Sequence, residues 1–459
     1  MTNTAYTPEE PIAAIATALA PGAIAMVRCS GRNCIEQACS VFSRPNALRT
    51  AEGNSLIHGW IVRPENGERI DEVMLGVYRA PKSFTGEDMV EICCHGGLAV
   101  VRAVLAVLLQ NGFRQAERGE FTFRAYINGK TDLTRAEAVK EIIESKTDSS
   151  RGRAAGRLAG NLFAEIDSVK HLIIDTLAAI EVAVEYPEDE ETIADSFDPA
   201  KLREARARLQ MLADSWKSEK LYQDGARVVL CGRTNAGKSS LFNTLLKEER
   251  SIVSDIAGTT RDWLESWVSF DGIPVRLFDT AGLRKTEDVI EAAGVERTRD
   301  LTDEADLLLY LVDAMAGLCE EDREFLESHR TVPVLLVWNK CDSDSALPLP
   351  PEYKESVAVS AKRGLHIAAL TAAVARLLGR EEGSDRSRTG LGSERQKEAL
   401  VEALERLCHA LDTAESGSYG LDAVVQDLED SLGSLGELTG EGTPEDVLSS
   451  VLSQFCVGK

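Results

Sequence analysis

A glycine-rich loop that ends in a lysine and a serine is the stretch of this chain best suited to chemistry. Its sequence, Gly232-Arg-Thr-Asn-Ala-Gly-Lys-Ser239, has the spacing GxxxxGK(S/T) of a phosphate-binding loop. It follows an apolar run, Arg227–Cys231, and precedes a helical pattern, Ser240–Leu246. In this order of strand, loop and helix, backbone N–H groups and the helix N-terminus bind a polyphosphate. Lys238 would then contact the β- and γ-phosphates, and the Ser239 hydroxyl would bind Mg²⁺.

Two further stretches could complete a site for a triphosphate and its metal ion. Asp279-Thr-Ala-Gly282 ends an apolar run, so the Asp279 carboxylate can hold Mg²⁺ through water and the Gly282 amide can contact a γ-phosphate. Gly258-Thr-Thr-Arg-Asp262 lies between the glycine-rich loop and Asp279, where a threonine hydroxyl could bind the same ion.

A second pair of stretches indicates which base is bound. Asn339-Lys-Cys-Asp342 follows the apolar run Val334–Trp338, and Ser360-Ala-Lys362 follows the next expected strand. The Asp342 carboxylate can accept two hydrogen bonds from the N–H groups of guanine, which adenine cannot offer. Backbone amides of residues 360–362 would complete the base pocket. Together the five stretches predict a GTPase domain that binds GTP rather than ATP.

One position departs from many regulatory GTPases. Where those proteins have a glutamine that orients the attacking water, this chain has Leu283, whose side chain cannot form a hydrogen bond. Another polar group must therefore position the water. The spacing leaves four acidic candidates open: Glu287, Asp288, Glu291 and Glu296.

Length and composition limit the classes to which the chain can belong. At 459 residues it exceeds what one hydrophobic core usually serves, so two or three domains are expected. Its net charge of −24 disfavours non-specific binding to nucleic acid. No apolar run reaches the ~18 residues of a membrane span, and acidic residues precede the apolar patch Ile12–Ala20 where a signal peptide would have basic ones. We expect a cytoplasmic protein that does not contact a membrane.

The elements that must position these residues fall into four segments. Residues 1–127 are β-rich with one helix, residues 128–222 are helical, residues 223–382 alternate strands and helices, and residues 383–459 are helical again. The expected strands are Ala23–Arg28, Ser55–Val62, Arg69–Tyr78, Asp88–Cys93, Ala226–Cys231, Leu264–Phe270, Val275–Phe278, Leu307–Val312, Val334–Trp338 and Val357–Val359. The expected helices outside residues 223–382 are Gly97–Gln110, Arg135–Glu144, Leu158–Val184, Pro199–Tyr222, Glu394–Thr413, Leu421–Leu435 and Pro444–Phe455. The simplest topology inserts the nucleotide domain into a helical domain built from both flanks.

Two clusters outside the nucleotide motifs have both a structural and a functional interpretation. Arg151, Arg153 and Arg157 form a basic cluster, which is either a solvated helix face, the interpretation we favour, or a contact for nucleic acid. Cys93-Cys94-His95 suggests a metal site. Because neighbouring residues on a strand point to opposite faces, we favour small buried residues there.

The chain resembles the MnmE/TrmE family of tRNA-modifying GTPases over its whole length. In the nucleotide domain the resemblance rests on Asn235-Ala-Gly-Lys-Ser-Ser240, Gly258-Thr-Thr-Arg-Asp262 and Asp279-Thr-Ala-Gly-Leu283. Upstream it rests on Ser83-Phe-Thr-Gly-Glu-Asp88, His95-Gly-Gly97 and Gly119-Glu-Phe-Thr122. Its most specific part is the C-terminal stretch Phe455-Cys-Val-Gly-Lys459.

This resemblance implies a multidomain fold of mixed α/β and α+β class. A β-rich N-terminal tetrahydrofolate-binding domain forms a homodimer, an all-α helical domain is discontinuous, and a Ras-like P-loop GTPase domain is inserted. The implied activity is K⁺-dependent hydrolysis of GTP with Mg²⁺. With a flavoprotein partner, MnmG/GidA, in a heterotetramer, the family adds an aminomethyl or carboxymethylaminomethyl group to the wobble uridine of tRNA. The implied one-carbon donor is 5-formyl- or methylene-tetrahydrofolate.

The same resemblance implies roles for single residues. Glu291 would orient the attacking water, and Thr260 would join Ser239 as a Mg²⁺ ligand. The implied K⁺ ligands are Asn235, Ser254, Ile256 and Thr259, and the implied folate ligands are Arg28, Glu91, Lys130 and Lys459. The implied GTP contacts are Asn235, Ala236, Gly237, Lys238, Ser239, Ser240, Ser254, Asp255, Ile256, Ala257, Gly258, Thr259, Thr260, Asp279, Thr280, Ala281, Gly282, Asn339, Lys340, Asp342, Ser360, Ala361 and Lys362.

The C-terminal cysteine and three departures from the family qualify the resemblance. Cys456 is either an apolar residue at a helix end or a reactive thiol beside Lys459, and we favour a catalytic role. The chain departs from the family at Thr234 in the glycine-rich loop and, near the implied folate ligands, at Leu19–Ala25 and Arg118.

Three functions stay open on the sequence alone. The first is the GTPase part of a tRNA wobble-uridine modification complex. The second is a GTPase switch in ribosome assembly or RNA chaperoning, a class that typically carries an appended basic RNA-binding module. The third is a folate-dependent enzyme regulated by GTP. The acidic balance, the β-rich N-terminal segment and the cysteine tail favour the first.

Overall fold

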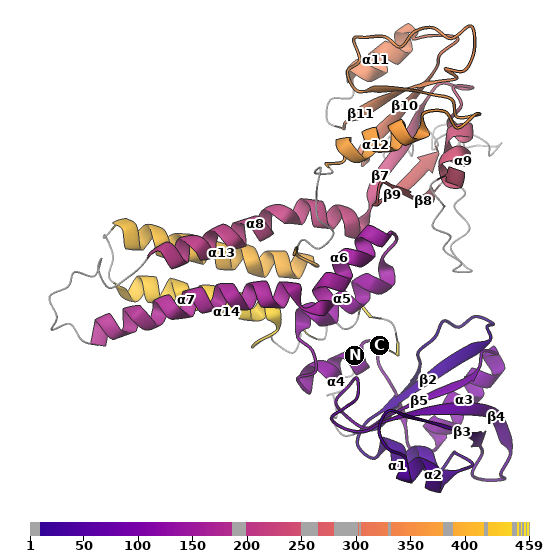
Figure 1. Ribbon diagram of the computed structural model, residues 1–459, viewed down its shortest axis with the longest axis vertical. Coiled ribbons are helices and arrows are strands. Elements are labelled where there is room, and N and C mark those ends of the chain that lie inside the picture. The colour runs from indigo at the N-terminus through magenta and orange to yellow at the C-terminus, as the bar shows by residue number, and fades with distance from the viewer. Residues whose placement is uncertain are drawn as a thin grey trace, which may run out of the picture. The chain divides into compact units, whose positions relative to one another are not determined.

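The computed structural model describes residues 10–185, 199–248, 265–279, 302, 304–328, 332–379, 389–416, 421–442, 448, 451, 454, 455, 457 and 458. The chain divides into two compact units, one formed by residues 1–140 with 435–459 and the other by residues 141–434. Figure 1 shows the elements of each unit. Among the described residues, every helix is too short or too polar to cross a membrane. The bounds of the four segments expected from the sequence stay predictions.

The first unit is built on a six-stranded sheet. In spatial order its strands are β3 (Ser55–Val62), β4 (Arg69–Tyr78), β5 (Met89–His95), β2 (Ile24–Ser30), β1 (Ile12–Ile15) and β6 (Arg114–Gln115). Neighbouring strands are antiparallel except β1 and β6, which are parallel. Alternate side chains along a strand point to opposite faces, so Leu75, Val77 and Ile92 lie in the core on one face.

Helices cover this core face, and one helix also covers part of the other face, where Phe121 packs with Ile12, Ala14 and Met89, leaving the rest of that face open. The helices that begin in the first unit are α1 (Cys34–Cys39), α2 (Pro45–Thr50), α3 (Leu98–Gln110), α4 (Glu120–Ile127) and α5 (Leu133–Glu144). The apolar side of α3 packs on β1, β2, β4 and β5. On the open face, Ile24, Leu56 and Met74 have exposed fractions of 71%, 68% and 38%. An exposed apolar sheet face of this kind is typical of an interaction surface.

The second unit combines long helices with a second sheet. Its helices include α6 (Asp148–Ala159), α7 (Asn161–Glu185), α8 (Pro199–Asp224), α9 (Lys238–Glu248), α11 (Glu320–Ser328), α12 (Ile367–Leu377) and α13 (Glu394–Ser416), and α14 (Leu421–Thr439) begins in it. Helix α8 packs against α7 and α13, so segments that flank the second sheet in the sequence lie side by side (Figure 1).

The second sheet is largely parallel and covered on both faces. In spatial order its strands are β12 (Ser356–Val359), β11 (Val334–Asn339), β10 (Leu307–Asp313), β7 (Ala226–Gly232), β9 (Ile273–Asp279) and β8 (Glu265–Phe270). Only the edge strand β8 runs antiparallel to its neighbour. On β10, Leu309 packs with residues of α9 and α12, whereas Tyr310 stacks on Phe325 of α11, 4.6 Å away, on the other face. Burial on both faces explains the continuous apolar runs of these strands.

Most expected elements are confirmed, and the structure adds elements that the sequence did not predict. Strands occupy Ser55–Val62 and Arg69–Tyr78 with the expected bounds. The helix expected over Leu158–Val184 is confirmed as α7 but begins at Asn161, because Gly160 takes a left-handed φ of 99° and ends α6 just before it. The apolar patch that includes β1 was not expected to form a strand. The helix expected over Pro444–Phe455 falls largely outside the described residues.

Candidate functional site

The glycine-rich loop joins β7 to α9 and brings the backbone close to neighbouring strands. Gly232 and Gly237 have φ values of 125° and 99°, which glycine adopts without strain. A Cβ atom on Gly232 would lie 2.3 Å from the Leu311 carbonyl oxygen, and one on Gly237 would lie 2.1 Å from Asn339 Nδ2. Both positions therefore exclude a side chain. This is the close backbone approach that a phosphate-binding loop requires.

Lys238 and Ser239 begin α9, where the predicted phosphate and metal contacts lie. Lys238 Nζ donates hydrogen bonds to the carbonyls of Gly232 (2.6 Å) and Arg233 (2.8 Å), so the ammonium group lies within the loop. Ser239 Oγ donates to Asp279 Oδ2 at 2.9 Å. Ser239, a predicted Mg²⁺ ligand, is thus adjacent to Asp279, which was predicted to hold the ion through water. A hydroxyl and a carboxylate fit the preference of Mg²⁺ for oxygen.

A buried amide joins the glycine-rich loop to the predicted base pocket. The Asn339 side chain is 2% exposed, and its Nδ2 donates to the Ala236 carbonyl at 2.8 Å. Its Oδ1 accepts a hydrogen bond from the Ala361 amide at 3.0 Å. From α9, Thr244 Oγ1 donates to the Ala361 carbonyl at 2.7 Å. Three of the motifs found in the sequence therefore meet at the carboxyl ends of parallel strands, where open α/β sheets bind ligands.

Asp342 is the residue predicted to select guanine, and its surroundings keep it ionised. A hydrogen bond from the Ser360 side chain lowers the pKa of the Asp342 carboxyl below its usual range, and the nearby Arg363 and Lys362 act in the same direction. Arg363 Nε lies 2.9 Å from Asp342 Oδ2. An ionised carboxylate has only acceptors, as two guanine N–H donors require. Lys340, two residues before Asp342, has a left-handed φ of 67° and pairs with Asp313 at 2.5 Å.

Of the other predicted GTP contacts that the structure describes, Ala236 is buried, whereas Asn235 and Ser240 are exposed in and after the glycine-rich loop. Several predicted site residues lie outside the described residues. These are Ser254, Asp255, Ile256, Ala257, Gly258, Thr259, Thr260, Thr280, Ala281, Gly282, Glu291, Cys456 and Lys459, together with Leu283 and the alternatives Glu287, Asp288 and Glu296.

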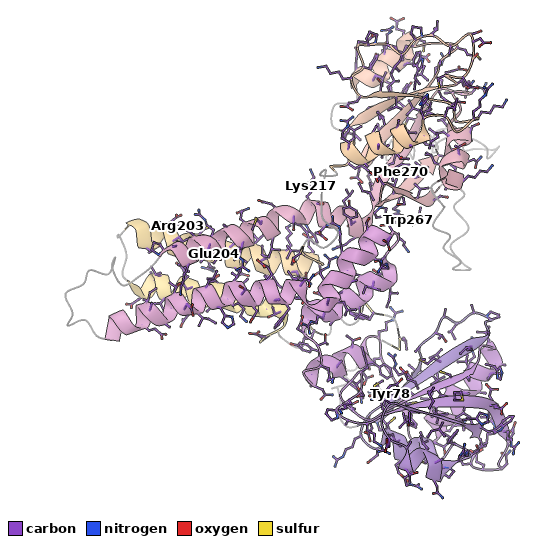
Figure 2. All side chains as sticks on the ribbon, in the orientation of Figure 1. Tyr78, Arg203, Glu204, Lys217, Trp267 and Phe270 are labelled. Carbon is purple, nitrogen blue, oxygen red and sulfur yellow. The ribbon has the colours of Figure 1, made fainter. Side chains whose placement is uncertain are left out.

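Arg28 and Glu91, the first two predicted folate ligands, are paired in the first unit. They are cross-strand neighbours on β2 and β5, and Arg28 Nη2 lies 2.8 Å from Glu91 Oε1. Tyr78, at the end of β4 (Figure 2), donates a hydrogen bond to Glu91 Oε2 at 3.1 Å. Burial, and then the charge of Glu91, raise the pKa of Tyr78, so the phenol stays a donor at neutral pH. No motif in the sequence assigned a role to Tyr78.

Aromatic rings and the C-terminal tail surround Arg28. Its guanidinium carbon lies 5.4 Å from the ring centre of Phe84 and 5.7 Å from that of Phe121. Arg28 Nη1 also donates to the Gly458 carbonyl at 3.4 Å. Arg118, one of the departures from the family, forms a β-bridge with Val457. The tail thus reaches the predicted folate site.

Lys130 lies beside the same site without contacting the Arg28–Glu91 pair. Its Nζ donates to the Pro81 carbonyl at 3.0 Å. A Cβ atom on Gly86 would lie 3.3 Å from Lys130 Cγ, so Lys130 packs on the loop that carries Phe84. Phe84 is 41% exposed, which is unusual for a large aromatic residue. In the sequence, only the position of Phe84 in the motif Ser83–Asp88 indicated that this residue could have a functional role.

Glu87 and Glu120, which belong to two of the family motifs, have a structural role near this site. Arg124 is fully buried and bonds Glu87 Oε2 at 3.0 Å and Glu120 Oε1 at 2.9 Å. This network ties the stretch that contains Glu87 to the one that contains Glu120. Paired charges buried in this way hold the two segments in place.

The basic cluster expected on a solvated helix face is largely buried, so that interpretation is wrong for Arg153 and Arg157. Their exposed fractions are 6% and 3%. Both pair with Glu219 of α8, and Arg157 also bonds Glu141 Oε2 at 2.5 Å. Arg151 is exposed and pairs with Asp148 at 2.6 Å.

The second cluster, Cys93-Cys94-His95, shows no metal geometry. Cys94 is buried as favoured, but Cys93 is partly exposed and His95 is exposed and paired with Asp71 at 2.7 Å. Within the described part of the chain, no group of histidine, cysteine and acidic residues could hold a metal ion.

Comparison with known proteins agrees with the motifs and covers both units. Residues 11–130 match the family profile of the GTP-binding protein TrmE N-terminus, and residues 133–456 match that of the MnmE helical domain. The tRNA modification GTPase MnmE of Treponema denticola is 50% identical over 469 residues, covering 99% of each chain. The protein of the same name from Enterococcus faecalis is 40% identical over 458 residues, covering 98% of each chain. Among solved structures, a variant of Era from Aquifex aeolicus bound to GDP and AlF4⁻ is 28% identical. That match covers 39% of this chain and 66% of its own at a TM-score of 0.28, too low to support an argument.

Proposed function

The chain belongs to the MnmE family of tRNA modification GTPases, and we propose that it is the GTP-hydrolysing component of a complex that modifies the wobble uridine of tRNA. The observation that carries this proposal is that hydrogen bonds join four motifs, three of them through Asn339 and the fourth through the Ser239–Asp279 bond. The phosphate loop, the Asp279 strand end and the Ser360–Lys362 loop are joined by hydrogen bonds within one sheet edge. That arrangement suits a magnesium-bound guanine nucleotide.

In the proposed site, each residue has a separate role. Lys238 neutralises the β- and γ-phosphates, Ser239 and Thr260 hold Mg²⁺, and Asp279 orients its water. Asp342 and the residues 360–362 select guanine. Bound K⁺ would supply the positive charge that an arginine finger supplies elsewhere, held by Asn235, Ser254, Ile256 and Thr259. Glu291 positions the attacking water, because Leu283 cannot.

The base pocket is tested by Asp342→Asn. The change replaces one of two acceptors with a donor, which then faces a guanine N–H. Losing a hydrogen bond to a charged group and adding a repulsion should lower kcat/KM for GTP at least about tenfold. Xanthosine triphosphate presents an acceptor at the changed position, so its kcat/KM should rise. Steady-state hydrolysis of both nucleotides measures the switch.

The matched control is Asp344→Asn, an exposed aspartate two positions along the chain, which should change neither rate. Hydrolysis of GTP by Asp342→Asn with an unchanged KM would show that the base pocket is assigned to the wrong residues.

We further propose that the first unit binds 5-formyl- or methylene-tetrahydrofolate. Support comes from the Arg28–Glu91 pair, the Tyr78 hydroxyl and the exposed Phe84 ring. The Glu91 carboxylate suits the amino and N–H donors of a pterin, and Arg28, Lys130 and Lys459 suit the carboxylates of the folate tail. The open sheet face with Ile24, Leu56 and Met74 supports a homodimer formed through this unit.

The remaining parts of the proposal concern organisation and partners. The packing of α8 on α13 supports a GTPase domain (residues 223–382) inserted into a helical domain (residues 128–222 and 383–459), after an N-terminal domain (residues 1–127). In the cytoplasm, the homodimer would join two copies of the flavoprotein MnmG/GidA. The complex would then place an aminomethyl or carboxymethylaminomethyl group on the uridine.

A further inference from the structure

The hairpin formed by β8 and β9 connects the nucleotide site to the helices by short contacts at its tip and its middle. The strands pair from Glu265↔Phe278 to Phe270↔Ile273, with Asp271 and Gly272 alone in the turn. Both turn residues have positive φ, 52° and 89°, as a type I′ turn requires. The far end of the hairpin is Asp279, which bonds Ser239. A tight turn and a continuous ladder make the hairpin a stiff element.

At the tip, the first turn of α6 contacts the hairpin. Thr147, the N-cap of α6, is 9% exposed, and its hydroxyl donates to the Gly272 carbonyl at 2.8 Å. The same oxygen accepts from the Ser150 amide at 3.1 Å. Since the only hydroxyl proton of Thr147 goes to Gly272, the Ser150 hydroxyl must be the donor in its 2.7 Å contact with Thr147. A Cβ atom on Gly272 would lie 2.4 Å from Ser149 Oγ, so the tip fits closely.

In the middle of the hairpin, Trp267 contacts the chain between α8 and β7. A Cβ atom on Gly225 would lie 2.4 Å from Trp267 Cζ3. Lys146 Nζ lies 6.0 Å from the centre of the Trp267 ring, within cation–π range. Figure 2 labels Trp267 and Phe270 on β8. The hairpin therefore contacts both the start of α6 and the end of α8.

Helix α6 is itself joined to α8 by buried ion pairs. Arg153 and Arg157 both bond Glu219, and Arg157 Nη1 also donates to the Gly390 carbonyl at 3.3 Å. A shift of the hairpin tip would consequently move α6, and through these bonds it would also affect α8 and the segment that leads into α13.

We propose that the β8–β9 hairpin couples the nucleotide site to the helices of the second unit, with the Thr147 hydroxyl as the positioning contact at its tip. The inference rests on the proposed nucleotide site. It goes beyond that site because it assigns a path for a structural change. A γ-phosphate bound near Asp279 would shift the hairpin, and the hairpin tip would shift α6. Thr147 touches no nucleotide and acts only through Gly272.

The test separates the hairpin contact from the helix cap. Thr147→Asp keeps an acceptor for the α6 N-terminus but, ionised at neutral pH, has no proton for the Gly272 carbonyl. Thr147→Ser keeps both hydrogen bonds and is the matched control. Hydrogen–deuterium exchange of the α6 amides of residues 150–153 is measured in the full chain with GDP and with a non-hydrolysable GTP analogue. Binding of a fluorescent GDP is measured in parallel.

We expect the α6 exchange rates of the wild type and Thr147→Ser to differ between the two nucleotides by about fivefold, the effect of one hydrogen bond on a local opening equilibrium. In Thr147→Asp this difference should disappear while GDP affinity stays within about twofold of the wild type. If Thr147→Asp does not fold, Thr147→Gly decides, because glycine is tolerated at an N-cap but has no hydroxyl for the Gly272 carbonyl, so the difference should disappear. A difference that persists in these variants, or is absent from the nucleotide-bound wild type, would overturn the coupling. Failure of the wild type to bind GDP would instead overturn the proposed function.

Discussion

Asn339 links the two halves of the proposed nucleotide site. Both ends of its buried amide are bonded, one to the phosphate loop through Ala236 and the other to the base loop through Ala361. Satisfied buried polar groups fix one arrangement of the backbone around them. The two halves of the nucleotide site are therefore held in register by one side chain, even before a ligand binds.

Asn235 carries a prediction about the cation. It is exposed at a left-handed φ of 66° in the phosphate loop, so its side chain is available to a bound ion. GTP hydrolysis should be at least about tenfold faster in KCl than in NaCl at matched ionic strength, because Na⁺ is too small for the same oxygen cage and a charge-stabilising group is lost. Asn235→Ala should remove most of this difference. Equal rates of the wild type in both salts would rule out a K⁺ site.

The packing of α6 on α8 depends on the carboxylate of Glu219. This residue lies on α8, its side chain is 2% exposed, and it pairs with two arginines of α6. Glu219→Gln leaves the buried Arg153 without its charge partner and Arg157 with Glu141 alone, and should cost about 3–5 kcal/mol of stability. Scanning calorimetry of the full chain should show the transition of the second unit at a lower temperature.

The neighbouring residue supplies the control for Glu219. Lys220 pairs with Glu394 at 3.5 Å, and both side chains are about half exposed (51% and 49%). Lys220→Met should therefore change stability by less than about 1 kcal/mol. Equal effects of the two substitutions would mean that the buried network does not hold α6 to α8.

The elements differ in how well the sequence predicts them, for a physical reason. The nucleotide motifs follow strand ends, and carboxyl ends of parallel strands share one edge, so local pattern places Ser239 beside Asp279. The burial of Arg153 depends on Glu219, which is 66 residues away, and no local pattern shows that pairing. Tyr78 and Phe84 join Arg28 from separate segments, so their place at the proposed folate site could be found only from the fold.

At the scale of the whole molecule, the two proposed chemistries lie in different units. The C-terminal tail reaches Arg28 in the first unit through Gly458, whereas the nucleotide motifs belong to the second. A Cβ atom on Gly458 would lie 2.7 Å from the Ile15 carbonyl oxygen, so the tail is closely seated there. This seating places Val457, the residue after Cys456 in the chain, near the proposed folate site.

Cys456→Ser should separate these chemistries. Serine is nearly the same size as cysteine but is a poor nucleophile at neutral pH. The variant should lose wobble-uridine modification in cells while its K⁺-stimulated GTPase rate and its dimerisation are unchanged. Cys408→Ser, at a partly exposed cysteine of α13, is the control and should keep both activities. Normal modification by Cys456→Ser would make Cys456 a packing residue, and loss of GTPase activity would make the tail structural.

Nucleoside mass spectrometry of tRNA tests most directly whether this chain hydrolyses GTP in the service of tRNA modification. In a strain that lacks the gene, the wobble uridine should carry no aminomethyl or carboxymethylaminomethyl group. The wild-type chain should restore it. Glu291→Ala should not, because its kcat for GTP should fall by ~10²–10⁴ while nucleotide binding persists. Full modification in the strain that lacks the gene would contradict the account.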